Sequence, residues 1–281
     1  CGATTASNIQ GNTIKNINWT NNTTAYFFGI FINTTGKVDV GTTTGNTIGS
    51  NTGTGSITVT NTTSSSNALV IGITTSSADE VNCQNNTIGS ITTNNSAANA
   101  TNFIGIRRIG AGTTTISNNT IGSTTEPNSI NASSPSTTDA QTVIGISQLG
   151  EGTATITGNT ISNMKNGTTN GTTTVKGYNY GIYLSLGTNT VTNNTVRDLT
   201  IANANISYDS TSASVGGIVN YAGTTSTQTI SGNTIYGLSN TNGAAEVCVR
   251  GIYFYGPIAA STSDIYNNFI YGLSVSSSST S

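Results

Sequence analysis

The apolar positions of this chain follow a long repeat. The motif Asn-Thr-Ile, or a close variant of it, returns at intervals of 33 to 40 residues along the sequence. Such self-similarity is typical of solenoids, in which each unit buries its apolar face only against its neighbours. The asparagines of the eight copies are Asn12, Asn46, Asn86, Asn119, Asn159, Asn194, Asn233 and Asn268.

Three further markers divide each unit into short strands. A Gly-Ile pair lies between successive asparagines, and an apolar residue lies three positions before and five positions after most of them. Thr43, Asn51 and Thr124 interrupt these flanking positions. In the segment Thr155–Thr157 one isoleucine is flanked by two hydroxyl residues, which is the alternation of a β-strand. We therefore predict three short strands and one long loop per unit.

These units predict an all-β fold, a right-handed single-stranded parallel β-helix of about eight coils. Equivalent positions of successive coils then form columns with a spacing of about 4.8 Å. The isoleucines fill the interior, and the asparagines form a hydrogen-bonded ladder, because an Asn side chain suits a turn and both donates and accepts. We assign residues 1–273 to one β-helix domain, a segment of a longer repeat array, and the Ser-rich residues 274–281 to a flexible tail.

The strand around each Gly-Ile pair is apolar on both faces. We predict that the residues directly before and after the glycine point inward, so that the residue two positions before it, such as Phe103, points outward. A strand of this composition is typically covered on both sides. The long loop that precedes it either covers the outer stripe or leaves it exposed as a contact surface.

Several segments resemble a known group of proteins. Residues 230–239 (ISGNTIYGLS), 251–254 (GIYF) and 267–273 (NNFIYGL) look like the repeats of large secreted Bacteroidetes proteins, which are similar to the pectate-lyase-like β-helix superfamily. The resemblance covers nearly the whole chain and is specific for architecture, because a fold does not determine a function. It implies export to the cell surface within a longer polypeptide, with adhesion as one role.

The composition limits which partners, metals and cofactors the chain is expected to bind. Only 6% of the residues are charged, and eight basic and ten acidic residues give a net charge of −2, so we expect no nucleic-acid partner. Histidine is absent and three cysteines lack ligand spacing, so we expect no metal and no cofactor. No apolar run is long enough for a transmembrane segment. The start at Cys1 resembles a lipidated bacterial N-terminus; the alternative is a chain cut there.

Many β-helices are polysaccharide lyases or hydrolases, but the residues for that chemistry are missing from the pattern. Hydrolysis needs two carboxylates on either side of the scissile bond. The ten acidic residues do not recur at equivalent positions of adjacent units. We therefore expect no catalytic residues. Arg107 and Arg108 are candidates for gripping an acidic sugar, with ordinary surface charge as the alternative.

A repeated pair of hydroxyl residues suggests another function. In four units two hydroxyls flank the inward apolar residue, and stacking would align them in two columns on one face. Ice-binding β-helices use arrays of this kind, although Thr and Ser are also ordinary outward residues of strands. The pairs are Thr115 and Ser117, Thr155 and Thr157, Thr190 and Thr192, and Thr229 and Ser231.

We accordingly expect a non-catalytic structural or adhesive module of an extracellular or cell-surface protein. The alternatives are a polysaccharide-binding module or polysaccharide-cleaving enzyme, and an ice-binding protein. Neither end of the repeat carries a polar cap of the kind that keeps solenoids soluble. The expected partners are therefore neighbouring repeats or another copy stacked end to end, together with surface glycans or other cell-surface proteins.

Overall fold

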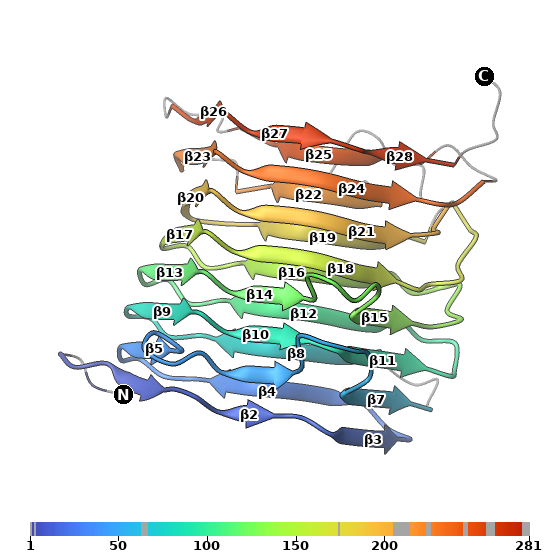
Figure 1. Cartoon of the computed structure of the whole chain (residues 1–281), viewed down its shortest axis with the longest axis horizontal. Coiled ribbons are helices and arrows are strands. Elements are labelled where there is room, and N and C mark those ends of the chain that lie inside the picture. Colours follow the sequence, from blue (N-terminus) through green and yellow to red (C-terminus); the bar gives the residue numbers. More distant parts are fainter. Residues whose placement is uncertain are drawn as a thin grey trace.

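The computed structural model is a stack of parallel coils, a β-solenoid (Figure 1). It describes residues 2, 4–62, 67–173, 175–204, 214–222, 226–243, 247–256 and 262–276. All the strands in these ranges pair in parallel with equivalent strands of neighbouring coils, which confirms the predicted parallel β-helix. This part of the chain holds no helix of the length and apolar character needed to cross a bilayer.

Three sheets run along the stack. Sheet A contains β1 (Ser7–Ile9), β5 (Val38–Val40), β9 (Val81–Gln84), β13 (Thr114–Ser117), β17 (Thr153–Thr157), β20 (Thr188–Thr192), β23 (Gln228–Ser231) and β26 (Asp264–Tyr266). Sheet B contains β2 (Thr13–Ile14), β3 (Ile17–Asn21), β6 (Thr47–Gly49), β7 (Ile57–Asn61), β10 (Thr87–Gly89), β11 (Ile91–Asn95), β14 (Thr120–Gly122), β15 (Ile130–Ser133), β18 (Thr160–Asn166), β21 (Thr195–Ile201), β24 (Thr234–Asn240), β27 (Phe269–Tyr271) and β28 (Ser274–Val275). Sheet C contains β4 (Tyr26–Ile32), β8 (Ala68–Thr75), β12 (Thr101–Arg108), β16 (Gln141–Gln148), β19 (Gly177–Leu184), β22 (Val215–Asn220) and β25 (Val249–Phe254).

The number of turns is slightly smaller than the sequence suggested. Sheet A has eight strands and sheet C has seven, so the chain makes about seven complete turns. The prediction of about eight coils was one too many, because eight asparagines enclose seven intervals. Strand pairing reaches Val275 in β28, two residues into the segment predicted as a tail, and residues 277–281 lie outside the described part.

Branched aliphatic side chains fill the interior in columns. Ile48, Ile88 and Ile121 lie directly above one another on sheet B, and all three are fully buried. Burying a side chain of this size stabilises the fold by about 1.5–3 kcal/mol. The column continues in register through the remaining coils, as the repeat predicts, with Ile161, Val196 and Ile235.

The repeated asparagines form a continuous ladder at the corner between sheets A and B. The backbone N–H and the side-chain Nδ2 of Asn119 both donate to Oδ1 of Asn159, at 3.0 and 2.9 Å, and the same Nδ2 donates to the carbonyl of Cys83. Equivalent bonds join all eight predicted asparagines, which confirms the ladder. The bonds between asparagines all run from one residue to Oδ1 of the next toward the C-terminal end, so this part of the ladder has a direction.

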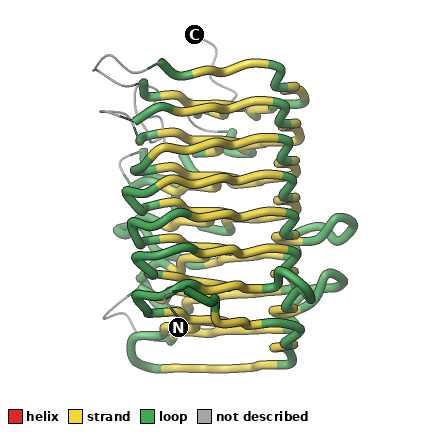
Figure 2. The backbone as a smooth tube through the Cα atoms, turned by 90° about the vertical axis from the view of Figure 1, so that its left-hand side faces the viewer, coloured by secondary structure: helices red, strands yellow, loops and turns green. Residues whose placement is uncertain are grey.

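Two loops explain where the repeat looked irregular. Residues 50–56 and 123–129 project from the stack at the break within sheet B (Figure 2). The apolar residue expected at Asn51 is supplied after the loop by Ile57, which pairs with Ile91. Ile130 does the same for the interruption at Thr124. The spacing of the apolar positions changes in these coils, but their place in the column does not.

Sheet C departs from the predicted alternation. Phe103 and Ile106 are both buried in the main core, whereas Ile104 packs against a separate cluster outside it. The strand register skips Gly105, whose added Cβ would lie 2.7 Å from a methyl of Ile121, so only glycine fits there. The prediction for the residues before the glycine was therefore wrong, because Gly105 and Ile106 both face the interior, which shifts the phase of the strand.

Candidate functional site

The outer face of sheet A carries an array of hydroxyls. Thr115 pairs with Thr155, and the same column continues through Thr190 and Thr229. A second column runs in register beside it, as the sequence predicted, through Ser117, Thr157, Thr192 and Ser231. Strand pairing therefore brings the eight predicted hydroxyl residues together on four adjacent strands.

A third column, which the sequence reasoning missed, completes the array. Thr153 pairs with Thr188, and Thr113 and Thr227 stand at the equivalent position of the strands on either side. Its signal was present in the sequence as a threonine two residues before each hydroxyl pair. The resulting hydroxyl array consists of Thr113, Thr115, Ser117, Thr153, Thr155, Thr157, Thr188, Thr190, Thr192, Thr227, Thr229 and Ser231.

The array rests on a rigid base and contains no charged side chain. Beneath it the inward residues, among them Ile116 and Ile156, are buried. Thr192 donates from Oγ1 to Oγ1 of Thr157 at 3.0 Å, so neighbouring hydroxyls also bond along the column. Figure 2 looks onto this side of the molecule, where the strands follow one another in a regular stack. The pattern ends at Asn82 on one side and at Asp264 on the other.

The outer face of sheet C carries a second, aromatic surface. Ile144, Tyr180 and Val219 form a buried cluster there, separate from the main core. Tyr178 and Tyr183 flank Tyr180, with ring centroids 5.4 and 6.1 Å from it. Burial raises the pKa of Tyr180 and of Tyr183 above the ordinary value for a phenol.

These tyrosines line a small open pocket, the tyrosine pocket. Its volume is about 240 Å³, and Thr142, Ile144, Tyr178, Tyr180 and Tyr183 line it. None of these lining residues is charged. Ten of the eleven tyrosines lie in the C-terminal half of the sequence, but the phase shift in sheet C decides which of them meet on its outer face.

The two predicted arginines have different environments. Arg107 lies half-buried on the outer side of sheet C and donates from Nε to Oγ1 of Thr74 at 3.1 Å. Arg108 is fully buried and donates to the Ser77 carbonyl at 2.6 Å and to Thr114 Oγ1 at 2.5 Å. Burial lowers the pKa of Arg108 to about 10. Arg108 is therefore a structural residue between coils and does not reach a ligand on the surface.

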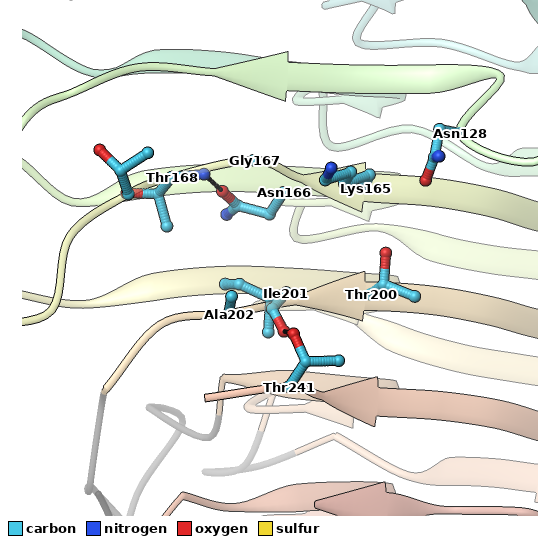
Figure 3. A pocket seen from close by; sticks show the side chains of 10 residues that line it. Asn128, Lys165, Asn166, Gly167, Thr168, Thr200, Ile201, Ala202 and Thr241 are labelled. Carbon is cyan, nitrogen blue, oxygen red and sulfur yellow. Dashed lines mark hydrogen bonds between the residues drawn. The ribbon is translucent and has the colours of Figure 1, made fainter. Parts of the chain in front are cut away.

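A larger hollow lies beside the ends of β18, β21 and β24 (Figure 3). Its volume is about 450 Å³, and its lining includes four threonines and the exposed cation of Lys165. Asn128, from the loop 123–129, lies at the right-hand end of the lining in Figure 3. Sequence reasoning missed this hollow, because it depends on a loop that lies outside the repeat.

Asp39 and Glu80, two acidic residues that lie close together beside sheet A, do not have the environment of a catalytic pair. Nδ2 of Asn82 bridges Asp39 and Glu80, donating to them at 2.9 and 3.2 Å, and Glu80 also pairs with Lys37 at 3.1 Å. The bond from Asn82 and the pairing with Lys37 lower the pKa of Glu80. A glycosidase acid needs the opposite shift, because it must hold a proton near neutral pH. Glu80 therefore lacks the environment of a general acid.

Cysteine and metal chemistry are equally limited in the described ranges. The thiol of Cys83 is buried in the core, which raises its pKa to about 12. The described residues contain no cluster of three or more His, Cys, Asp or Glu side chains that could hold a metal. Cys1, the candidate for lipid attachment, lies outside them.

Comparison of the chain with protein-family models, curated proteins and solved structures gave no match. The resemblance to secreted Bacteroidetes repeats therefore stays a prediction from the sequence. The function of the chain has to be inferred from its own surfaces.

Proposed function

We propose that this protein is a non-catalytic extracellular module that serves as a rigid rod and adheres to a neutral glycan through the outer face of sheet C. The tyrosine pocket carries the proposal, because it is an open apolar concavity with phenol hydroxyls on a rigid sheet. The extracellular setting is supported by the low charge of the chain and by its resemblance to secreted repeat proteins.

The lining of the pocket favours a sugar without charge. The partly exposed rings of Tyr178 and Tyr183 offer faces on which the C–H groups of a sugar stack, and Thr142 adds a hydroxyl, whereas Tyr180 is buried beneath them and supports their positions. Each tyrosine also provides a polar group at the end of an apolar body, a combination enriched at binding surfaces. The described lining has neither a cation for an acidic sugar nor a carboxylate for catalysis.

Affinity electrophoresis through gels containing soluble neutral polysaccharides, such as xyloglucan and mixed-linkage β-glucan, tests the proposal. We expect at least one gel to retard the protein and Tyr183→Ala to abolish the retardation. Tyr266→Ala is the control, because Tyr266 is 52% exposed and lies in β26 of sheet A, on a different sheet from the pocket. Unretarded migration of the unmodified protein in neutral gels, or equal retardation of Tyr183→Ala, would overturn the proposal.

The hydroxyl array supports a second candidate function, binding to the surface of ice. Its rows repeat about every 4.8 Å along the stack and about every 6.7 Å along the strand, because alternate residues of a strand face the same side. Ser117 and Ser231 are only 7% exposed, and a ligand that engages the other ten positions must itself be periodic in two directions, as a crystalline water lattice is. The array carries no aromatic ring, so it lacks the stacking surface that a crystalline polysaccharide would favour.

Threonine side chains suit such a lattice for a further reason. Their χ1 angle is restricted by the β-branch, so each hydroxyl and methyl is held in place before binding. A surface that is ordered in advance loses less conformational entropy when the ligand binds.

Thermal hysteresis and ice-affinity partitioning measure this second function. Thr155→Lys places a long charged side chain in the middle of the hydroxyl array, and we expect it to remove both activities. Thr92→Lys is the matched control, because Thr92 is an outward, half-buried threonine in β11 of sheet B. If the unmodified protein shows no thermal hysteresis, or if Thr155→Lys keeps the hysteresis, ice binding by this face is excluded. If the unmodified protein instead adsorbs to crystalline cellulose, the ligand of the array is a polysaccharide.

A further inference from the structure

The hollow beside the ends of β18, β21 and β24 contains a cation that the fold itself does not use (Figure 3). The ammonium group of Lys165 is exposed and makes neither an ion pair nor a hydrogen bond with any described residue. Among the described residues that line the hollow there is no carboxylate that could neutralise this charge. A concave surface of one sign of charge raises the local concentration of ions of the opposite sign. The hollow is therefore suited to an anionic ligand.

Two neutral donors lie beside Lys165. Thr200 is its register partner in β21, one coil further along, and its side chain lies on the same outer face of sheet B. Asn128 comes from the loop 123–129, and in Figure 3 its amide and the hydroxyl of Thr200 point toward each other. Neither side chain has a hydrogen-bond partner among the described residues. We call Lys165, Thr200 and Asn128 the donor cluster.

The loop 123–129 is tied to the stack at both ends, which holds Asn128 in place. Ser129, directly after Asn128, is fully buried, and its Oγ accepts a bond of 2.9 Å from a backbone N–H of a neighbouring coil. Ser123 is equally buried at the start of the loop and donates from Oγ to a carbonyl two coils away at 2.6 Å. A side chain that is positioned in advance loses less entropy when a ligand binds.

The donor cluster matches a sulfate ester more closely than it matches other anionic groups. It offers a single positive charge and three donor groups. A sulfate ester carries a single negative charge on three terminal oxygens, whereas a carboxylate has only two oxygens. A phosphate monoester carries about −1.5 to −2 at neutral pH, which one lysine does not balance. The ammonium of lysine is a compact point charge that suits a tetrahedral oxyanion, whereas the planar fork of arginine matches a carboxylate.

We infer that this hollow binds the ester sulfate of a sulfated polysaccharide, with the sulfate at the donor cluster and the sugar ring against Ile201 and Ala202. These two residues give the lining an apolar patch, and the hydroxyl of Thr241 beside them can accept a bond from the sugar. The site belongs to sheet B, whereas the tyrosine pocket belongs to sheet C. The inference therefore does not rest on the neutral glycan proposed for that pocket.

Biolayer interferometry on immobilised polysaccharides at physiological ionic strength tests the inference. The panel contains κ-carrageenan, chondroitin 4-sulfate and chondroitin 6-sulfate, each paired with its chemically desulfated form. At least one sulfated polymer should bind, and its desulfated form should bind about tenfold or more weakly, because a charge-assisted contact is lost. Desulfated chondroitin keeps its carboxylates, so it separates recognition of sulfate from recognition of any anionic sugar. The net charge of −2 gives the whole chain no general attraction for polyanions.

Substitutions in the donor cluster assign the binding to the hollow. Lys165→Gln should weaken binding about tenfold or more, and Thr200→Val, which removes one neutral donor, about threefold. Lys15→Gln is the matched control, because Lys15 is equally exposed and its loss changes the net charge by the same amount, but it does not line the hollow. This control should bind as the unmodified protein does, and circular dichroism checks that each variant is folded.

The outcomes that contradict the inference are distinct from those that contradict the tyrosine pocket. Failure of the unmodified protein to bind any sulfated polymer, or equal binding to the desulfated forms, excludes sulfate recognition. Equal affinities of Lys165→Gln and Lys15→Gln exclude the hollow as the site. Lys165→Gln should leave retardation in neutral polysaccharide gels unchanged, so each site is tested without the other.

Discussion

Removing one rung from the middle of the asparagine ladder should destabilise the protein far more than its small change in volume suggests. In Asn159→Ala the backbone N–H of Asn119 loses its acceptor, and the carbonyl of Ile116 loses the donor Nδ2 of Asn159. Both groups are buried. A buried polar group without a partner costs about 1–3 kcal/mol, so the two together should lower the free energy of unfolding by about 2–6 kcal/mol.

Urea unfolding followed by circular dichroism measures this loss as a shift of the midpoint. Thr160→Ala is the control in the next position, because an outward threonine of β18 should change stability by no more than about 0.5 kcal/mol. Asn268→Ala should fall between the two, since this last described rung is partly exposed and water can replace its bonds. If Asn159→Ala unfolds at the same urea concentration as Thr160→Ala, the ladder contributes nothing measurable and the reasoning fails.

Three further outcomes follow from burial and close packing. The thiol of Cys83 is buried and its pKa is raised to about 12, so Cys83 should resist a thiol reagent at pH 8 in the folded protein. The partly exposed Cys248 should react. Equal reaction rates of the two cysteines in a mass-spectrometric time course would contradict this. Gly105→Ala should lower the free energy of unfolding in urea by about 1–3 kcal/mol, since the added methyl overlaps the core. An unchanged unfolding midpoint would show that the strand shifts at no cost to make room for the methyl. Burial raises the pKa of Tyr180, so its contribution to stability is complete below the ordinary phenol pKa of about 10 and is lost as the pH rises beyond it. Tyr180→Phe should therefore flatten the alkaline fall in the unfolding midpoint, and pH profiles identical to those of the unmodified protein would refute the assignment.

The sequence predicts this architecture well because every coil must bury an apolar residue and pair an asparagine amide at the same positions. A residue such as Ile121 is buried by the equivalents above and below it, so the period of the apolar residue is the period of the fold. Asn119 is specified in the same way, since its amide must meet another amide one coil away. Register follows from these columns, and with it the alignment of the predicted hydroxyl pairs.

The features that escaped prediction are those that the repeat does not determine. The phase shift at Gly105 is invisible to simple alternation, because two consecutive residues take the same side of the strand. Arg108 was considered as a surface residue, but alternation from the buried Ile106 turns it inward, where carbonyl groups and a threonine hydroxyl satisfy it. The tyrosine pocket depends on the same shift. The hollow near Lys165 depends on a loop of one coil only.

The loops 50–56 and 123–129 show how the chain tolerates extra length. They emerge at the same break in sheet B, two coils apart, and touch through a bond of 2.6 Å from Oγ of Ser123 to the carbonyl of Asn51. Neither disturbs the strands that follow. Chain closure becomes only slowly less favourable as a loop lengthens, so this corner can accept foreign peptides while the coils keep their order. A tag, epitope or cross-linking site grafted there would be displayed at a known height on the rod.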